Sequence, residues 1–276
     1  MTGTVAQTIS LVSHGDAFLQ AGVMQPDYFL SNSVFQYCHQ VNFKKIIKPR
    51  LFRPSRQHLV AADPASWFHY LQRGGCTGLK LFYQPSATKS ARKDYQTAGF
   101  IGGGGIWAIE ALHRNHADYW SDHWEVTQKD DPQDRIWSVS YGNTFTGPRI
   151  VANNPGLRTA RCNLETALHD IIQFSQHKGF GSWIPLFQNS LDLLSSKDPQ
   201  KDRYYGDCLA ENWHSLESRQ LLFAAMAAWV FGGMGTWNDI YIVDSETNEL
   251  YDQVSTNLYS AINQAFLAAI NSTEEN

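Results

Sequence analysis

The densest group of residues that could do chemistry lies within one short segment of the chain. Imidazole and carboxylate groups recur through it: His113, His116, Asp118, Asp122, His123 and Glu125. Nitrogen and oxygen donors of these types bind zinc, iron and manganese. The first five of these residues are therefore candidate ligands of a divalent metal ion, and such an ion is the one cofactor that the sequence suggests.

The same segment contains the parts of a metal-dependent hydrolase. The histidines and Asp118 would hold the metal ion, and Glu125 is a candidate general base. In an extended strand Asp122 and His123 point to opposite faces, so all six side chains cannot converge. The alternative is a polar hairpin loop in which a histidine has a structural role.

Four consecutive glycines at 102–105 are the most unusual backbone feature. Glycine adopts positive φ and lets a ligand or another backbone approach closely, which makes Gly103 and Gly104 candidate ligand-binding residues. The apolar residues that follow, 106–109, are typical of a strand, whereas a phosphate-binding loop opens a helix. A bulge or a tight bend is therefore the favoured alternative.

A second candidate ligand-binding loop holds Trp237, Asn238 and Asp239. It follows an apolar segment and the glycines at 232, 233 and 235, and loops supported by a rigid core often carry binding residues. The alternative, which we favour, is that the glycines end a helix. Trp237 would then join the core while its two neighbours hydrogen-bond the turn.

Two arginines, Arg158 and Arg161, precede a helix that Asn163 is expected to cap. A guanidinium group can hold an anion with two hydrogen bonds, so both are candidate ligand-binding residues. An ion pair with an acidic residue of the same fold is the alternative. Near the N-terminus, Ser13 and His14 stand side by side, but adjacency does not create the geometry of a catalytic triad.

A run of basic residues without an acidic one spans residues 44–56. It contains Lys44, Lys45, Lys48, Arg50, Arg53 and Arg56. Such a segment can bind nucleic acid or an acidic partner. We rank this function last, because the net charge is −4 and aromatic residues do not alternate with the basic ones. A solvated segment, or one that lies near acidic residues of the C-terminal region, is the alternative.

Composition excludes several classes of protein. Hydrophobic residues make up 43% of the chain, which argues for a folded core. The longest apolar run, 221–231, is shorter than the roughly 20 residues of a membrane helix. The four cysteines are far apart, and the N-terminus does not resemble a secretory signal. We therefore expect a soluble cytoplasmic protein that does not associate with membranes.

The elements that must position these residues change character near residue 155. In the strand-rich part, 1–155, Asp63 and Pro64 predict the start of a helix that ends at Gly74. Strands are predicted at 79–83, 100–112, 119–127 and 136–141, with a turn at 129–133. Together the strands predict an antiparallel meander with one aromatic face buried.

The second part, 156–276, is helical. Caps and apolar spacing predict helices at 163–178, from Ser182, from Ser215, and at about 246–270. Strands followed by helices favour an α+β fold, with an antiparallel sheet in the N-terminal half packed with a mainly helical C-terminal half. No segment resembles an interdomain linker, so we expect residues 1–276 to form a single mixed α/β domain.

None of the common nucleotide-binding, zinc-protease or serine-hydrolase motifs occurs in the chain. The leading hypothesis is a protein-interaction or ligand-binding module, because Trp and Tyr, which are abundant here, are enriched at interface hot spots. It implies a protein partner. The alternative is a metal-dependent hydrolase that uses the cluster at 113–125. The third hypothesis is the binding of nucleic acid or an acidic partner through residues 44–56.

Overall fold

A computed structural model describes residues 1–47, 56–86, 92–150 and 155–272. Strands occupy the N-terminal half and helices the C-terminal half, which confirms the predicted α+β class. The strands are β1 (Cys38–Ile47), β2 (Arg56–Ala61), β3 (Gly78–Gln84), β4 (Ile106–Leu112), β5 (Ala117–Val126) and β6 (Trp137–Gly147). The helices are α1 (Gly3–Ala21), α2 (Tyr28–Ser31), α3 (Pro64–Arg73), α4 (Asp94–Thr97), α5 (Leu157–Lys178), α6 (Ile184–Leu193), α7 (Leu216–Ala227) and α8 (Ser245–Asn271).

The strands form one sheet with the spatial order β2-β1-β6-β5-β4-β3. Strands β3 to β6 pair antiparallel in sequence order, which confirms the predicted meander. The sheet is mixed rather than purely antiparallel, because β1 pairs parallel to β6. The predicted strand at 100–112 begins only at Ile106, since positive φ at Gly102, Gly104 and Gly105 turns the chain before it.

Buried aromatic rings fill the space between the sheet and the helices beside it, as the meander pattern predicts. The rings of Phe43 and Trp67 stack with centroids 4.3 Å apart, and Tyr141 also stacks on Phe43, at 5.4 Å. Trp120 meets Trp67 edge to face. All four side chains are at most 1% exposed, so β1, β5, β6 and α3 share one core.

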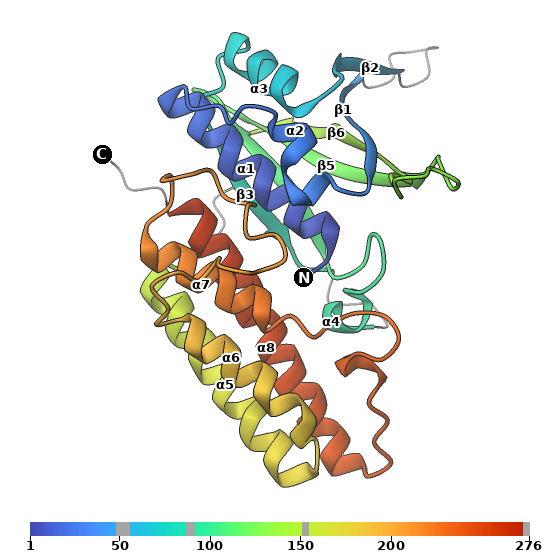
Figure 1. Cartoon of the computed structure of the whole chain (residues 1–276), viewed down its shortest axis with the longest axis vertical. Coiled ribbons are helices and arrows are strands. Elements are labelled where there is room, and N and C mark those ends of the chain that lie inside the picture. The colour runs from blue at the N-terminus through green and yellow to red at the C-terminus, as the bar shows by residue number, and fades with distance from the viewer. Residues whose placement is uncertain (48–55, 87–91, 151–154, 273–276) are drawn as a thin grey trace.

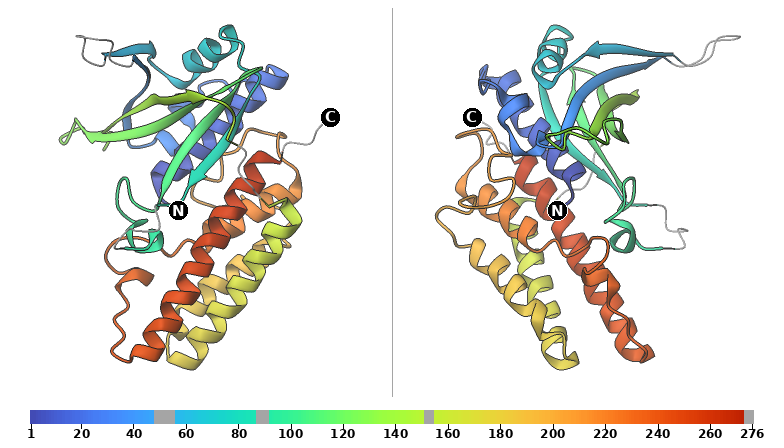
Figure 2. Two further views of the ribbon diagram at one scale, coloured as in Figure 1. Left: turned by 180° about the vertical axis from the view of Figure 1, so that it is seen from behind. Right: turned by 45° about the vertical axis from the view of Figure 1, so that its right-hand side comes forward.

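Helix α1 lies against the sheet and is buried continuously from Val5 to Phe18. It contacts β3, β4, α3 and α8. Figure 1 shows it crossing the sheet, with the long helices α5 to α8 gathered below, and Figure 2 shows the same arrangement from two other sides. The sequence pattern does not predict this helix, because its polar residues interrupt every apolar stripe.

Most predicted helix starts coincide with side-chain caps. Asp63 accepts a hydrogen bond from the amide of Ser66 at 2.8 Å, Ser215 caps α7, and Asp244 caps α8. Helix α5 is an exception: it begins at Leu157, so the predicted cap at Asn163 is wrong. Helix α6 begins at Ile184, after a 3₁₀ turn at Gly181–Trp183 that includes the predicted start at Ser182.

Strand β3 is at one edge of the sheet, and helix side chains occupy that edge. Asp16 of α1 accepts a hydrogen bond from the amide of Leu79 at 2.9 Å. The side-chain amide of Asn271, at the end of α8, accepts from the Leu81 amide at 2.8 Å and donates to the Leu81 carbonyl at 2.9 Å. An open edge invites pairing with another chain, and these contacts instead tie both helices to the sheet.

Among the described helices, none combines the length and the apolar character that a membrane crossing requires.

Candidate metal-binding site

The tight hairpin between β4 and β5 brings three of the predicted ligands together. His113 follows the last residue of β4, His116 precedes the first residue of β5, and Asp118 lies one residue into β5. The amide of His113 donates to the carbonyl of His116 at 2.9 Å, which closes the hairpin. The register that pairs Leu112 with Ala117 then places all three side chains at this end of the two strands.

The three side chains form a compact group. One ligand atom from each lies within 4.8 Å of the other two. Nε2 of His113 is 3.6 Å from Oδ2 of Asp118, and the two side chains are only 11% and 15% exposed. The imidazole rings of His113 and His116 stack almost parallel, with centroids 4.5 Å apart. This is the one group of three such residues that approach so closely within the described parts of the chain.

The buried nitrogen of His113 has no hydrogen-bond partner. Its Nε2 atom is inaccessible to solvent and nothing in the described structure donates to it or accepts from it. Burial lowers the pKa of His113, while Asp118 and the backbone carbonyls of Gly75 and Gly74 act in the opposite direction. A lowered pKa keeps the imidazole neutral at pH 7, so it has a lone pair to offer to a metal ion.

An outer contact orients one of the ligands. Thr146 of β6 donates its hydroxyl to Oδ1 of Asp118, which leaves Oδ2 facing His113. Such second contacts hold metal ligands in position.

The distance between the ligand atoms of His113 and Asp118 suits a zinc ion, whereas the ring of His116 would have to turn. Two ligand atoms of a tetrahedral zinc ion lie about 3.4 Å apart, for metal–nitrogen bonds of roughly 2.1 Å, and the His113–Asp118 separation of 3.6 Å is close to that value. Two stacked, parallel rings cannot both hold one metal ion in their planes. Coordination therefore requires the ring of His116 to turn out of the stack.

The other members of the predicted cluster lie elsewhere. His123 and Glu125 are four or more residues further along β5, pair with each other at 3.0 Å and are largely exposed. Asp122 accepts a hydrogen bond from the indole of Trp124. Seven residues of extended strand separate Glu125 from Asp118, which is about 20 Å. Glu125 is therefore too distant to act as general base for a metal ion at His113.

The glycine segment has a structural role and also backs a cavity. A Cβ atom at position 103 would lie 2.0 Å from the carbonyl oxygen of Thr97, so the turn requires glycine there. The carbonyl of Gly104 accepts a hydrogen bond from the hydroxyl of Tyr259 at 2.6 Å. Tyr259 lines a cavity of about 530 Å³ between β3, α4 and α8.

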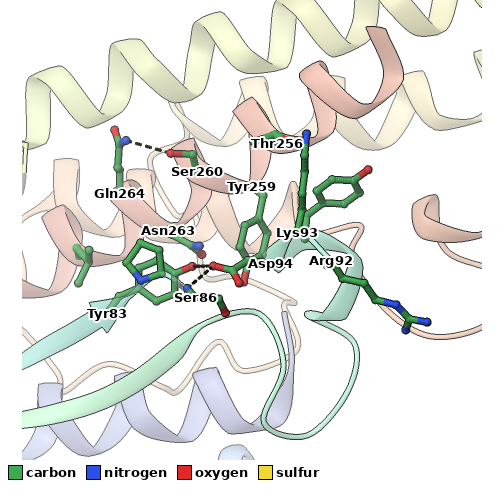
Figure 3. Close-up of a pocket in the computed structure, with 13 residues that line it drawn as sticks. Tyr83, Ser86, Arg92, Lys93, Asp94, Thr256, Tyr259, Ser260, Asn263 and Gln264 are labelled. Carbon is green, nitrogen blue, oxygen red and sulfur yellow. Dashed lines mark hydrogen bonds between the residues drawn. The ribbon is translucent and has the colours of Figure 1, made fainter. Parts of the chain in front are cut away.

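Figure 3 shows this cavity, to which α8 contributes a row of polar side chains. On the opposite side, Asp94 accepts hydrogen bonds from the hydroxyl of Tyr83 and the amide of Ser86, each at 3.0 Å. Asn263, which is 3% exposed, has an Oδ1 atom without a hydrogen-bond partner. The sequence pattern does not single out these residues, because they come from segments far apart in the chain and share no motif.

The Trp237 loop is part of the core. Trp237 is fully buried, and its indole donates to the hydroxyl of Ser255 at 2.7 Å. Asn238 donates to the carbonyls of Tyr95 and Gly232, and Asp239 accepts from the amide of Gly235. These contacts fit the core position expected for Trp237 and the hydrogen bonds expected for its two neighbours. The glycines do not end the preceding helix, however, since α7 already ends at Ala227.

The glycine segment and the Trp237 loop meet, whereas the histidine hairpin is remote from both. A Cβ atom at Gly99 would lie 2.3 Å from the backbone of Gly232, so the two loops touch. The glycines precede β4 and the histidine hairpin follows it. A seven-residue strand of about 20 Å therefore separates the candidate ligand loops from the candidate metal ligands.

The two arginines lie within α5 rather than before it. Arg161 pairs with Glu165 one turn further on, with Nε 3.1 Å from Oε1, which confirms the ion-pair alternative for this residue. Arg158 is exposed in the first turn. The anion-binding prediction for Arg161 thus competes with its ion pair to Glu165.

Only part of the basic segment can be placed, because Lys48, Arg50 and Arg53 lie outside the described residues. Lys44 donates to the hydroxyl of Ser140 at 3.3 Å. Figures 1 and 2 show the β1–β2 hairpin and the first turns of α8 at opposite ends of the molecule. The acidic residues near the start of α8 therefore do not compensate the described part of this segment.

No protein-family model matches the chain, and comparisons with curated proteins and with solved structures found no similar protein either.

Proposed function

We propose that the protein binds a divalent transition-metal ion, zinc in the first place, through His113, His116 and Asp118. The observation that carries the proposal is the convergence of three ligand atoms within 4.8 Å around a buried Nε2 atom that has no hydrogen-bond partner. An unsatisfied buried nitrogen costs roughly 1–3 kcal/mol, and a metal–nitrogen bond would remove that cost. Two imidazoles and a carboxylate are a zinc-type donor set.

Three protein ligands leave a coordination position for water. In zinc enzymes such a position activates a water molecule, whereas structural zinc sites usually have four protein ligands. The hydrolase hypothesis needs a general base as well, and the predicted one, Glu125, lies at the distant part of β5. The proposal therefore keeps the metal ion of the hydrolase hypothesis, without a reaction attached.

The interaction hypothesis loses part of its support from the sequence. It rested on the abundance of Trp and Tyr, but none of the nine Trp side chains is exposed, and Trp67, Trp120 and Trp237 are at most 1% exposed. The tryptophans are therefore accounted for by the core, whereas Tyr204 and Tyr241 are exposed. Binding of a protein partner stays a prediction that rests on composition alone.

A cytoplasmic location remains part of the proposal. The four cysteines are free thiols, and Cys162 among them is exposed. An exposed free thiol persists most readily in a reducing compartment. Burial raises the pKa of Cys76, which lies near Asp118, to about 11, so this thiol is protonated at pH 7.

The first test is zinc binding by chelator-treated protein, measured by equilibrium dialysis with elemental analysis. We expect one zinc ion per chain, and loss of at least tenfold in affinity for His113→Ala and for His116→Ala. The matched control is His123→Ala, which removes an exposed histidine from the same strand and should bind zinc like the wild type. Absence of bound zinc in the wild type, or loss of binding in the His123 variant alone, would refute the site.

Cobalt(II) provides a second readout that does not depend on affinity. A cobalt ion held by two imidazoles and a carboxylate in a tetrahedral site gives strong visible absorption, which an octahedral, water-bound ion lacks. We expect this absorption in the wild type and in His123→Ala, and its loss in Asp118→Asn. Weak octahedral absorption in all three proteins would show surface binding only.

A further inference from the structure

A second cavity, of about 510 Å³, lies where the segment between α6 and α7 crosses α1. This segment, residues 194–215, has no helix or strand, and irregular segments of such length within a compact fold are usually functional or disordered. Here the segment is attached at several points. The amide of Ala210 donates to the hydroxyl of Ser13 at 2.9 Å, and the carboxylate of Asp207 accepts from the amide of Ser33 at 2.8 Å.

The role of Ser13 is to hold this segment. Its hydroxyl also lies 2.8 Å from Nε2 of His214, and the Ser13 side chain is 1% exposed. Both hydrogen-bonding directions of the hydroxyl are thus in use, away from solvent. The pair of Ser13 and His214 therefore fixes the wall of the cavity and does not resemble an activated nucleophile.

His14, the next residue of α1, lines the cavity itself. Its side chain is 5% exposed, and its Nε2 atom is buried without any hydrogen-bond partner. One face of the ring packs on Tyr28, with centroids 4.2 Å apart. Burial lowers the pKa of His14 to about 4, against the opposing effect of the Asp207 backbone carbonyl and carboxylate, so the imidazole is neutral at pH 7. A buried ring nitrogen without a partner is uncommon in a folded protein, and a ligand group in the cavity would supply the missing partner.

Arg219, from the first turn of α7, lines the same cavity. Its Nε atom is buried and unpartnered, while Nη1 donates weakly to Gln200 at 3.4 Å. Among the described residues no carboxylate forms an ion pair with it. A guanidinium of this kind can hold a carboxylate with two parallel hydrogen bonds.

The remaining charged groups restrict the ligand further. Glu211 and Asp207 also line the cavity, and the Asp207 carboxylate is already occupied by the amide and hydroxyl of Ser33. One cation and two carboxylates disfavour a polyanion such as a nucleotide. They favour a molecule that presents one carboxylate together with a hydrogen-bond donor. The volume is that of a small-molecule site.

From this juxtaposition we infer that the cavity binds a small α-amino or α-hydroxy acid. Arg219 holds its carboxylate, and Nε2 of His14 bonds the amino or hydroxyl group beside it. Glu211 lies at the same cavity, where an ammonium group would meet its carboxylate. This site is independent of the proposed metal site, because neither His14 nor Arg219 belongs to the histidine hairpin.

The test is isothermal titration of the full chain with L-α-amino acids, the matching α-hydroxy acids and inorganic phosphate. We expect at least one of the carboxylic acids to bind with one site per chain. A preference for amino acids that Glu211→Gln reverses would identify the ligand as an α-amino acid. A preference for hydroxy acids would identify it as an α-hydroxy acid. Binding of phosphate alone, or no binding by any acid, would overturn the inference.

Two charge-matched variants identify the site. Arg219→Gln is expected to raise the Kd of the bound acid at least tenfold, whereas Arg158→Gln, which removes an exposed arginine of α5, should leave it within twofold. If Arg219→Gln does not fold, ¹⁵N NMR of the wild type decides instead: the Nε2 resonance of His14 must shift on titration with the acid. Equal effects of both variants, or an unshifted His14 resonance, would overturn the assignment.

Discussion

At the scale of single residues, two buried histidines couple the stability of the fold to pH. Burial lowers the pKa of His14 and of His214 to about 4, and the nearby His14 acts in the same direction on His214. Both are less than 10% exposed. In the unfolded chain each would titrate near 6.5. Between these two values the unfolded state binds more protons than the folded state, so stability must fall as the pH falls.

We therefore predict that the free energy of unfolding decreases as the pH is lowered from about 6.5 to about 4. Each histidine contributes up to about 3 kcal/mol to this decrease. Urea denaturation at several pH values measures it. His214→Gln should flatten the dependence, while His177→Gln, which alters an exposed histidine of α5, should not. A pH profile identical in the wild type and in His214→Gln would contradict the assignment.

At the scale of elements, the end of α8 completes the sheet. The side-chain amide of Asn271 bonds both backbone groups of Leu81 and so mimics one residue of a neighbouring strand. The last turn of α8 is thereby fixed to β3, which lies far earlier in the chain. The contact also blocks strand addition at that edge, where an unpaired N–H and C=O would otherwise be open.

We predict that Asn271→Ala lowers the free energy of unfolding by about 1–3 kcal/mol, because two backbone groups lose their partners. Thermal or chemical unfolding measures the loss. Asn257→Ala, an exposed substitution on the same helix, is the control and should change stability by less than about 0.5 kcal/mol. Equal stability of the two variants would show that water replaces the Asn271 amide at no cost.

At the scale of the whole molecule, α1 joins the two halves. It packs against β3, β4 and α3 of the strand-rich half and also contacts α8. Close approach to the sheet depends on Gly15: a Cβ atom there would lie 2.4 Å from Leu79 and 2.7 Å from Phe68. Polar residues of the same helix hydrogen-bond to both halves: Asp16 bonds to β3, and Ser13 bonds to the 194–215 segment.

Gly15→Ala is predicted to destabilise the fold by about 1–3 kcal/mol, although alanine has the higher helix propensity by about 1 kcal/mol. The added methyl group would force Leu79 and Phe68 out of their packing. Gly233→Ala, where a Cβ meets no atom within 4 Å, controls for the general effect of replacing glycine. An unfolding midpoint raised by Gly15→Ala would mean that helix propensity prevails and that α1 packs less closely.

The sequence by itself determined what depends on neighbours along the chain. Asp63 with Pro64 and Ser215 started helices as predicted, because a cap acts on amides two or three residues away. The meander of β3 to β6 followed from alternation and short turns. The proximity of His113 and Asp118 could also be predicted from the sequence, since a single hairpin turn separates the two residues.

Only the tertiary structure decided what depends on contacts between distant segments. The sequence of α1 has no apolar stripe from which a helix could be predicted. The helix is buried along most of its length, and its polar groups are satisfied by remote partners. The parallel pairing of β1 with β6 and the cavity that joins His14 to Arg219 have the same origin. Local propensity and spacing carry no information about which distant residues meet. Which distant residues meet depends on how the whole chain buries its apolar faces and pairs its hydrogen-bonding groups at the same time.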